Sequence, residues 1–258
     1  MTDISSVAIV TGASSGIGAA TAQRLARDFS ALTLVARGGG HLAAVGKCVK
    51  AIGAEPLILE KDLSVPEAAK EVVRETLNTF GRLNALVNIA GVVPARDLFD
   101  LTDEDWINGA ALKFHGARRL ALHAWDALKS TRGSIVFISG NAADCPRAAQ
   151  AAVGTINAAI EALAKAFADR GMTDGVQVNS VSPGAIMTGR RKAILEKAAA
   201  HARIPVVEVE RRFLERASIS RFGTAEEIAN LMAFVVSPQA RWLTGTTIRM
   251  DGGQVRSL

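Results

Sequence analysis

The sequence predicts a single α/β domain over residues 1–258, with a doubly wound parallel sheet covered by helices on both faces. Short apolar runs that suit buried strands alternate with longer amphipathic runs that suit helices, from one end of the chain to the other. Such alternation is typical of parallel strands joined by right-handed helical crossovers. Hydrophobic residues make up 49% of the 258 positions, which is enough for one large core.

The expected elements follow one another in regular order. The first helix has its apolar residues on one side, and the second strand then closes a βαβ unit. Strands are expected at 7–11, 32–36, 56–59, 84–88, 134–138, 176–181 and 246–249. Helices are expected at about 17–29, 39–53, 66–79, 103–129, 150–170 and 224–236.

A glycine-rich turn separates the first strand from the first helix. Three glycines with the spacing Gly12-x-x-x-Gly16-x-Gly18 follow the apolar strand. Such a turn presents free backbone N–H groups and the positive end of a helix dipole at one point, which binds phosphate. An ordinary glycine-rich turn is the alternative, but the complete βαβ unit favours dinucleotide binding. The residues expected to contact the cofactor here are Gly12, Ser14, Ser15, Gly16, Ile17 and Gly18.

The residues after the second strand indicate which dinucleotide binds. An acidic side chain there would accept hydrogen bonds from the ribose hydroxyls, but the strand ends in Ala36 and Arg37 follows. A guanidinium pairs with a 2′-phosphate, so NADP(H) is favoured over NAD(H), with an ordinary exposed arginine as the alternative. After the third strand, Asp62 is expected to accept a hydrogen bond from the adenine amino group, or else to cap a helix starting near Ser64. Its neighbour Leu63 is also assigned to the cofactor site.

The fourth strand ends in Asn88-Ile89-Ala90-Gly91. The small residues of this segment would let a cofactor pass over the edge of the sheet. We therefore expect Asn88, Ala90 and Gly91 to line the cofactor site.

The stretch 189–221 differs in character from the rest of the chain. It is charged and helical over 192–202 and 208–216, with Pro205 between the two helices. It follows the carboxyl end of a predicted strand, where ligands bind in open α/β sheets, so we interpret it as a substrate cap rather than as plain surface helices. The residues expected to line a largely apolar substrate pocket lie in 92–98, 140–148 and 185–215, and include Pro94, Ile186 and Phe213.

Composition argues against several classes of function. The net charge of +5 is spread along the chain, and the dense basic patch Arg190-Arg191-Lys192 has no interleaved aromatic residues, so nucleic-acid binding is not expected. The chain shows no uncharged apolar stretch of about 18 residues and no secretory leader pattern, which predicts a cytoplasmic protein without membrane contact. Cys48 and Cys145 form no metal-binding pattern and suit a reducing compartment, so no metal site is expected.

Further motifs complete a specific pattern along nearly the whole chain. The segments that carry it are Thr11 to Gly18, Asp62, Asn88 to Gly91, Asn179 to Thr188, Arg221 to Gly223, Glu226 to Ala229, Phe234 and Gly245 to Gly253. With these segments the chain resembles the classical short-chain dehydrogenase/reductase (SDR) family. The resemblance implies a Rossmann-type fold, a nicotinamide cofactor and a homodimer or homotetramer. It also implies that Thr188 binds the nicotinamide carboxamide, within a cofactor-binding segment that includes Pro183, Gly184 and Ile186.

The catalytic residues depart from this resemblance. Members of the family use a Tyr to pass a proton to or from the substrate oxygen, a Lys to lower the pKa of that Tyr, a Ser to hold the substrate oxygen and an Asn to support a proton-relay water. By the flanking motifs, the Asn, Ser, Tyr and Lys positions fall on Lys113, Gly140, Val153 and Asn157, with Ser139 one residue before the serine position. No realignment supplies the tyrosine, because the chain contains none.

Two of these changes suggest an exchange, because a lysine stands at the asparagine position and an asparagine at the lysine position. We hypothesise that Lys113 reaches the cleft and acts as the missing cation or as a general acid, with an exposed helix residue as the alternative. Adjacent side chains on a strand point to opposite faces, so Ser139 is expected to point away from the cleft unless the strand end is shifted. His115 and His123 are not expected to be catalytic, since His115 and Lys113 share no helix face. The candidate catalytic residues are therefore Lys113, Ser139 and Asn157.

Two functions remain open on the sequence alone. The first is an NADP(H)-dependent oxidoreductase that transfers hydride between the nicotinamide and a carbonyl or alcohol by an atypical site. The second is a non-catalytic nicotinamide-nucleotide-binding protein, such as a sensor, a regulatory subunit or an inactive homologue. The apparent cap and Thr188 favour the first, with a small-molecule substrate of unknown identity. The small residues expected to permit close helix packing across a two-fold axis are Ala110, Ala111, Ala151, Ala152 and Gly154.

Overall fold

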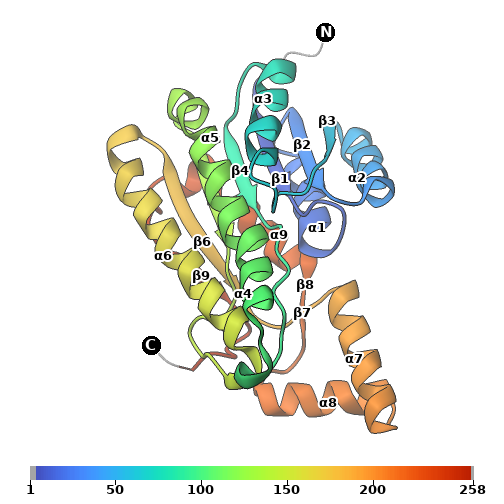
Figure 1. Ribbon diagram of the computed structural model, residues 1–258. Coiled ribbons are helices and arrows are strands. Elements are labelled where there is room, and N and C mark those ends of the chain that lie inside the picture. The colour runs from blue at the N-terminus through green and yellow to red at the C-terminus, as the bar shows by residue number, and fades with distance from the viewer. Residues whose placement is uncertain (1–3, 257–258) are drawn as a thin grey trace.

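A seven-stranded parallel sheet forms the centre of the protein in the computed structural model, which describes residues 4–256 (Figure 1). The strand order is β3-β2-β1-β4-β5-β6-β9, and every neighbouring pair is parallel. This order runs outward in both directions from β1 and confirms the predicted doubly wound sheet. The strands are β1 (Val7–Thr11), β2 (Ala31–Ala36), β3 (Glu55–Glu60), β4 (Ala85–Asn88), β5 (Ser134–Ile138), β6 (Gln177–Pro183) and β9 (Thr247–Met250).

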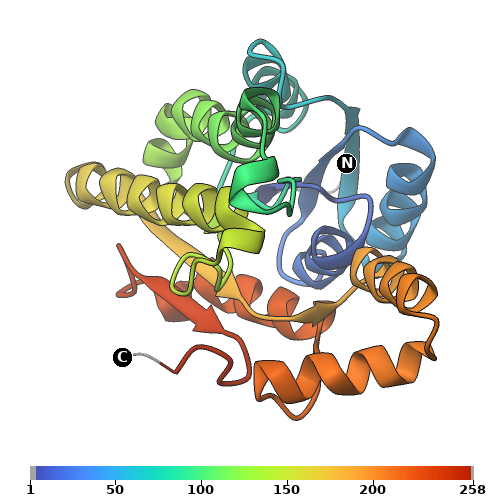
Figure 2. The same ribbon diagram turned by 60° about the horizontal axis from the view of Figure 1, so that its bottom comes forward.

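Helices cover both faces of this sheet, as predicted (Figure 2). One core cluster joins the sheet to α1 (Gly16–Leu25), α2 (Gly39–Ile52) and α9 (Ala225–Val235). A second joins the other face to α3 (Ala68–Phe80), α5 (Ala117–Thr131) and α6 (Ala151–Asp174). Because both faces are buried, the inner strands are continuous apolar runs.

The remaining elements lie mostly near the carboxyl ends of the strands. Besides α4 (Asp103–Ala110), the protein has α7 (Gly189–Ala202) and α8 (Val206–Ala217), which pack on each other beyond the sheet (Figures 1 and 2). Two short strands that the sequence did not predict, β7 (Ile186–Met187) and β8 (Gly223–Thr224), pair in a separate sheet at this end. Strands of two residues carry no periodicity by which a sequence could indicate them. Short 3₁₀ turns lie at η1 (Leu98–Asp100), η3 (Ala148–Gln150) and η4 (Pro238–Ala240).

The prediction of one continuous helix over 103–129 was wrong in one respect. A π-helical turn, η2 (Ala111–Gly116), lies between α4 and α5. A Cβ atom at Gly116 would lie 2.7 Å from the carbonyl oxygen of Leu63, so the chain packs tightly against a loop from another part of the fold there. A π turn changes the helical phase by about one residue and is frequent at functional sites.

Helix α6 is long and apolar enough by composition alone to cross a membrane. Core helices share these properties, and Ile156, Ile160, Ala164 and Ala168 of α6 are buried inside the molecule. We therefore describe α6 as a core helix, and the cytoplasmic location stays a prediction.

A buried carboxylate ties the end of α5 to the end of α6. The Asp174 side chain is 4% exposed and accepts hydrogen bonds from Trp125 Nε1 at 2.8 Å, Lys129 Nζ at 2.7 Å and Arg170 Nε at 2.8 Å. The hydrogen bonds from Lys129, Trp125 and Arg170 hold the pKa of Asp174 well below its ordinary value.

Replacing this carboxylate is expected to destabilise the fold. Asp174→Asn should lower the urea midpoint of unfolding at neutral pH, because the amide loses the charge that two cations and the indole share. Because the pKa of Asp174 is lower in the folded than in the unfolded protein, its ionised carboxylate stabilises the fold at pH values above the unfolded pKa of about 3.9. This stabilisation is lost as pH falls through the folded-state pKa. The difference between wild type and variant should therefore shrink in acid. Asp169→Asn, at an exposed position on the same helix, is the control, and an equal effect of both changes would contradict the prediction.

Candidate functional site

The turn after β1 is shaped by the close approach of its own backbone. Gly12 and Gly16 have φ values of +66° and +53°, in the left-handed region that favours glycine. A Cβ atom at Gly18 would collide with the carbonyl oxygen of Gly12, so only glycine fits where helix α1 begins. The predicted glycine spacing is therefore required by this strand–turn–helix geometry.

The amino end of α1 is open to an anion. Ser15 is the N-cap residue in extended conformation, its side chain makes no capping hydrogen bond, and the first turn contains no acidic residue. Free N–H groups and the positive end of the helix dipole therefore face the turn. A Cβ atom at Gly16 would lie 3.4 Å from Thr188 Cγ2, so the turn also adjoins the segment predicted to hold the nicotinamide.

Asn88 is a buried amide without a hydrogen-bond partner among residues 4–256. Its side chain stands at the end of β4, the residue is 5% exposed, and both Oδ1 and Nδ2 are unpaired. Thr11 Oγ1 accepts hydrogen bonds from the N–H groups of Ile89 and Ala90, each at 2.9 Å, which fixes the loop beside it. A buried amide left unpaired costs about 1–3 kcal/mol, so this position suits a polar ligand such as a nucleotide ribose.

The residues predicted to bind adenosine adjoin one another. Arg37 NH1 lies 4.0 Å from Asp62 Oδ2, and both side chains are well exposed. Asp62 Oδ1 also accepts from Ser64 N at 2.9 Å and Ser64 Oγ at 2.7 Å. Burial acts to raise the pKa of Asp62, but the Ser64 hydrogen bonds and the Arg37 charge outweigh it and leave the pKa lowered.

The alternative that Asp62 caps a helix starting near Ser64 was wrong. Helix α3 begins at Ala68, and its N-cap residue is Glu67. Asp62 instead closes a local turn through its bonds to Ser64.

Some predicted cofactor residues have side chains that pack in the core, and their assignment to the cofactor stays a prediction. Leu63 and Ile186 are 3% and 8% exposed and belong to the two core clusters, so their side chains are held in the protein interior. Pro183 is buried at the end of β6, and a Cβ atom at Gly184 would lie 2.6 Å from Asp251 Cα. The spacing of the motif alone could not separate these packing positions from those that face a ligand.

Lys113 lies on the π turn and reaches across to α6 and β5. Its Nζ atom donates a hydrogen bond to Asn157 Oδ1 and another, at 3.1 Å, to the carbonyl oxygen of Ser139. Asn157 Nδ2 in turn donates to the carbonyl oxygen of Gly140 at 3.3 Å. The structure thus brings together the two side chains of the predicted exchange, and Lys113 is not an exposed surface residue.

Two glycines make room for this contact. The stem of Lys113 lies across Gly91, where a Cβ atom would be 2.9 Å from Lys113 Cδ. At Gly140, with φ of +155°, a Cβ atom would be 2.9 Å from Asn157 Nδ2. Gly91 therefore faces Lys113, a role that the sequence pattern did not reveal.

The surroundings of Lys113 favour its neutral form more than water does. Burial and the charge of Arg190 lower the pKa of Lys113, the charge of Glu161 raises it, and the net result is a pKa of about 8. This value lies close to neutral pH, where a group is best placed to donate and recover protons.

Ser139 turns its hydroxyl away from Lys113 and uses only its carbonyl there. The hydroxyl donates to Glu161 Oε1 at 2.6 Å, and the carbonyl oxygen of Val181 lies 3.3 Å from the hydroxyl oxygen. This agrees with the expected alternation of side chains on a strand, so the hydroxyl is not placed to hold a substrate oxygen beside Lys113.

Neither histidine of this helical region contacts Lys113. His115 Nδ1 is buried without a partner in the described part of the chain, and burial, followed by the charges of Arg118 and Arg119, lowers the pKa of His115. Its ring packs edge-on against Phe114 with centroids 5.1 Å apart, and His123 is exposed.

An apolar cluster stands beside this polar group. Val153, which the flanking motifs assign to the tyrosine position, packs in it and contributes no hydroxyl. The cluster comprises Val93, Ala152 and Ile156, with Leu101, Trp106, Ala110, Phe114 and Val153 packed against them.

The predicted cap forms two helices beyond the carboxyl ends of the strands. Thr188 caps α7 by accepting from Arg191 N at 3.3 Å, and Arg191 lies over the Phe213 ring at 5.1 Å. Phe213 stacks on Phe222 with centroids 5.2 Å apart, so its ring is engaged within the protein. Helix α8 buries none of its residues, and its action as a substrate cap stays a prediction.

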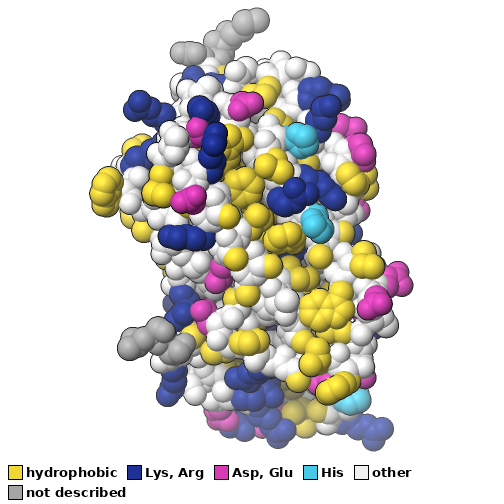
Figure 3. Space-filling view, turned by 60° about the vertical axis from the view of Figure 1, so that its left-hand side comes forward, with side chains coloured by type: hydrophobic (Ala, Val, Ile, Leu, Met, Phe, Trp, Pro, Cys, Tyr) yellow, Lys and Arg dark blue, Asp and Glu magenta, His cyan; other side chains and the backbone are white. Residues whose placement is uncertain are grey.

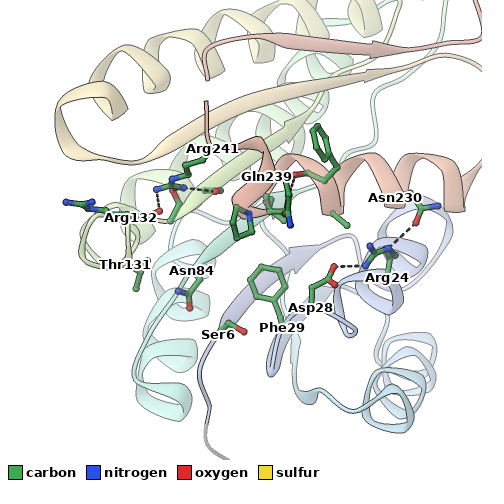
Figure 4. Close-up of a pocket in the computed structure, with 17 residues that line it drawn as sticks. Ser6, Arg24, Asp28, Phe29, Asn84, Thr131, Arg132, Asn230, Gln239 and Arg241 are labelled. Carbon is green, nitrogen blue, oxygen red and sulfur yellow. Dashed lines mark hydrogen bonds and ion pairs between the residues drawn. The ribbon is translucent and has the colours of Figure 1, made fainter. Parts of the chain in front are cut away.

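Two cavities lie away from this group of residues. The larger, of about 910 Å³, opens at the amino ends of the strands (Figure 4). Its Arg241 donates to the carbonyl oxygens of Arg132, Gly133 and Gly175, and its Arg24 donates to Asn230 and Asp28. These guanidinium groups are already paired within the protein. Neither this cavity nor the second one contains the residues predicted to line a substrate pocket.

The second cavity, of about 560 Å³, lies on the outer side of α5 and α6, where hydrophobic side chains sit among lysines and arginines (Figure 3). A homodimer or homotetramer stays a prediction. Two residues assigned to its helix packing were misplaced, because Ala152 is fully buried and a Cβ atom at Gly154 would lie 2.7 Å from the carbonyl oxygen of Ala142. Both positions are covered within the chain itself.

Comparison with known proteins agrees with this geometry. The sequence profile of a family described as Enoyl-(Acyl carrier protein) reductase matches residues 12–254. The short-chain reductase protein NovJ of Streptomyces niveus is 31% identical over 250 residues, covering 96% of this chain and 94% of NovJ. The 3-oxoacyl-acyl-carrier-protein reductase FabG of Staphylococcus epidermidis is 27% identical over 248 residues, covering 95% of this chain and 97% of FabG.

A solved structure extends the likeness to three dimensions. The L-sorbose reductase of Gluconobacter frateurii, complexed with NADPH and L-sorbose, superposes with a TM-score of 0.94 at 27% identity and covers 99% of this chain and 100% of that one. The profile match, the NovJ likeness and the strand order agree, and the chain belongs to the short-chain dehydrogenase/reductase family.

Proposed function

We propose that this protein is an NADP(H)-dependent oxidoreductase that interconverts a carbonyl and an alcohol, with Lys113 as the proton donor and acceptor. The observation that carries the proposal is the contact of Lys113 with Asn157 and the Ser139 carbonyl, next to Gly91, which is predicted to line the cofactor site. A positioned cation there takes the place of the tyrosine and lysine of relatives.

A nicotinamide dinucleotide would supply or accept the hydride when bound. The open amino end of α1 suits its pyrophosphate, and the unpaired Asn88 amide suits its ribose. Arg37 would pair with a 2′-phosphate, although it now adjoins Asp62. The NADPH complex of the L-sorbose reductase supports the choice of NADP(H).

Lys113 has the hydrogen-bonding capacity that the reaction needs. An ammonium has three donors, and Asn157 and the Ser139 carbonyl accept two of them. The third is free to donate to a carbonyl oxygen. As the carbonyl carbon receives hydride, Lys113 would pass a proton to that oxygen, become a neutral amine and later recover a proton from solvent. A pKa of about 8 suits both directions.

The rate of NADPH oxidation against pH tests this function. With L-sorbose and acetoacetyl-coenzyme A as probe carbonyls, reduction should decline above about pH 8, because the donor must begin protonated. Alcohol oxidation should show the opposite dependence, since the acceptor must begin neutral. A flat profile for reduction in this range would contradict the role of Lys113.

The second candidate is a non-catalytic nucleotide-binding protein. It is favoured by Gly140 and Val153, which provide no hydroxyl beside Lys113. NADPH binding by calorimetry, without NADPH oxidation with any carbonyl of a broad ketone panel, would support this alternative over the oxidoreductase.

A further inference from the structure

Glu161 lies behind the site, one helical turn after Asn157 on α6. Its carboxyl is half-buried, and Oε1 accepts the Ser139 hydroxyl at 2.6 Å. The carbonyl of the same Ser139 accepts Lys113 Nζ at 3.1 Å. One residue at the end of β5 therefore contacts the carboxylate with its side chain and the ammonium with its backbone.

The charged groups that act on Lys113 and on Glu161 come from different elements. Arg190, in the first turn of α7, and Glu161, on α6, act on Lys113 with opposite sign. Glu161 in turn is acted on by Lys113, by Asp144 from the loop after β5 and by Arg249 from β9. Asp144 is itself ion-paired with Arg249 at 3.0 Å. Glu161 is thus the acidic group that offsets both burial and Arg190 at Lys113.

We propose that Glu161 is a positioning residue that keeps Lys113 protonated in its buried site, acting across the Ser139 bridge. This inference rests on the proposed function, in which Lys113 donates the proton. It assigns a role to a carboxylate that does not touch the reacting atoms.

The physical reason is the cost of a buried ammonium. Desolvation disfavours the charged form, and a nearby cation such as Arg190 adds to this cost. A fixed carboxylate nearby attracts the ammonium and so offsets part of this free-energy cost. Burial, followed by the charge of Asp144, raises the pKa of Glu161 above its ordinary value, and the Ser139 hydrogen bond and the charges of Arg249 and Lys113 limit this rise.

A titration of Lys113 itself tests the proposal. The full-length protein is labelled with ¹³C-lysine, and the Lys113 Cε signal, assigned by its loss in Lys113→Met, is followed against pH by NMR. Glu161→Gln keeps the shape and removes the charge, and should lower the pKa of Lys113 by about one unit. Glu161→Asp, which keeps the charge, should restore most of the shift. In Glu161→Gln, the decline of the carbonyl-reduction rate at high pH should shift to lower pH by a similar amount.

Two further variants make the test specific. Ser139→Ala keeps the carbonyl but removes the hydroxyl that holds Glu161, and should lower the pKa of Lys113 less than Glu161→Gln does. If the Glu161→Gln protein does not fold, Ser139→Ala provides the test in its place. Asp144→Asn removes another acid near Glu161 and should leave Lys113 unchanged.

An unchanged Lys113 pKa in Glu161→Gln, or an equal fall in Asp144→Asn, would overturn the role of Glu161. Because the titration needs no turnover, its failure is distinct from failure of the proposed function, which would appear as absent NADPH oxidation by the wild-type protein.

Discussion

Lys113→Met is expected to lower the kcat of NADPH-dependent carbonyl reduction about 10²–10⁴-fold, the usual contribution of a positioned general acid. Methionine keeps the length of the stem across Gly91 but has no proton to donate. The affinity for NADPH should change little, because the phosphate and ribose contacts proposed for α1 and Asn88 remain. Steady-state kinetics and calorimetric titration of NADPH measure the two quantities separately.

A matched control is Lys70→Met, which removes an exposed lysine on α3 far along the chain from the site. It should retain wild-type kcat. A Lys113→Met protein that still turns over at the wild-type rate would show that another group supplies the proton. If wild type itself turns over no carbonyl, the binding-only alternative gains support.

Arg37→Asp is expected to reverse the preference between the two dinucleotides. A charge-assisted hydrogen bond is worth about 1.5–3 kcal/mol, so its loss should weaken NADPH binding about 10–150-fold. The new carboxylate would also repel a 2′-phosphate and could accept hydrogen bonds from the ribose hydroxyls of NADH. Calorimetric titration of both dinucleotides against wild type and variant measures the change.

The control for this change is Arg27→Asp, at an exposed position after α1, which alters net charge equally. It should leave the ratio of NADPH to NADH affinity as it is in wild type. An Arg37→Asp protein with an unaltered ratio would show that Arg37, 4.0 Å from Asp62, serves as an ordinary surface ion pair.

The strand, glycine turn and helix that are expected to hold a nucleotide could be predicted because their signals are local. The strand, turn and helix over 7–25 are contiguous, and a Cβ atom at Gly18 would collide with the carbonyl oxygen of Gly12 in the same turn. The order of apolar runs also determined the parallel sheet, since crossovers of one hand leave few arrangements. The short strand β7, the packing of Ile186 in the core and the stacking of Phe213 on Phe222 depend on distant neighbours and were not predictable.

By itself, the sequence determined the fold class, the glycine turn before the first helix and the absence of any tyrosine to move a proton. Only the tertiary structure decided that Lys113 donates both to Asn157, 44 residues away, and to the Ser139 carbonyl, and that the Ser139 hydroxyl turns to Glu161. The physical reason is that the direction of a side chain on a helix depends on its phase. The π turn over Ala111–Gly116, which contains Lys113, changes that phase. Gly116 at the end of this turn packs against Leu63, which lies on a loop from another part of the chain.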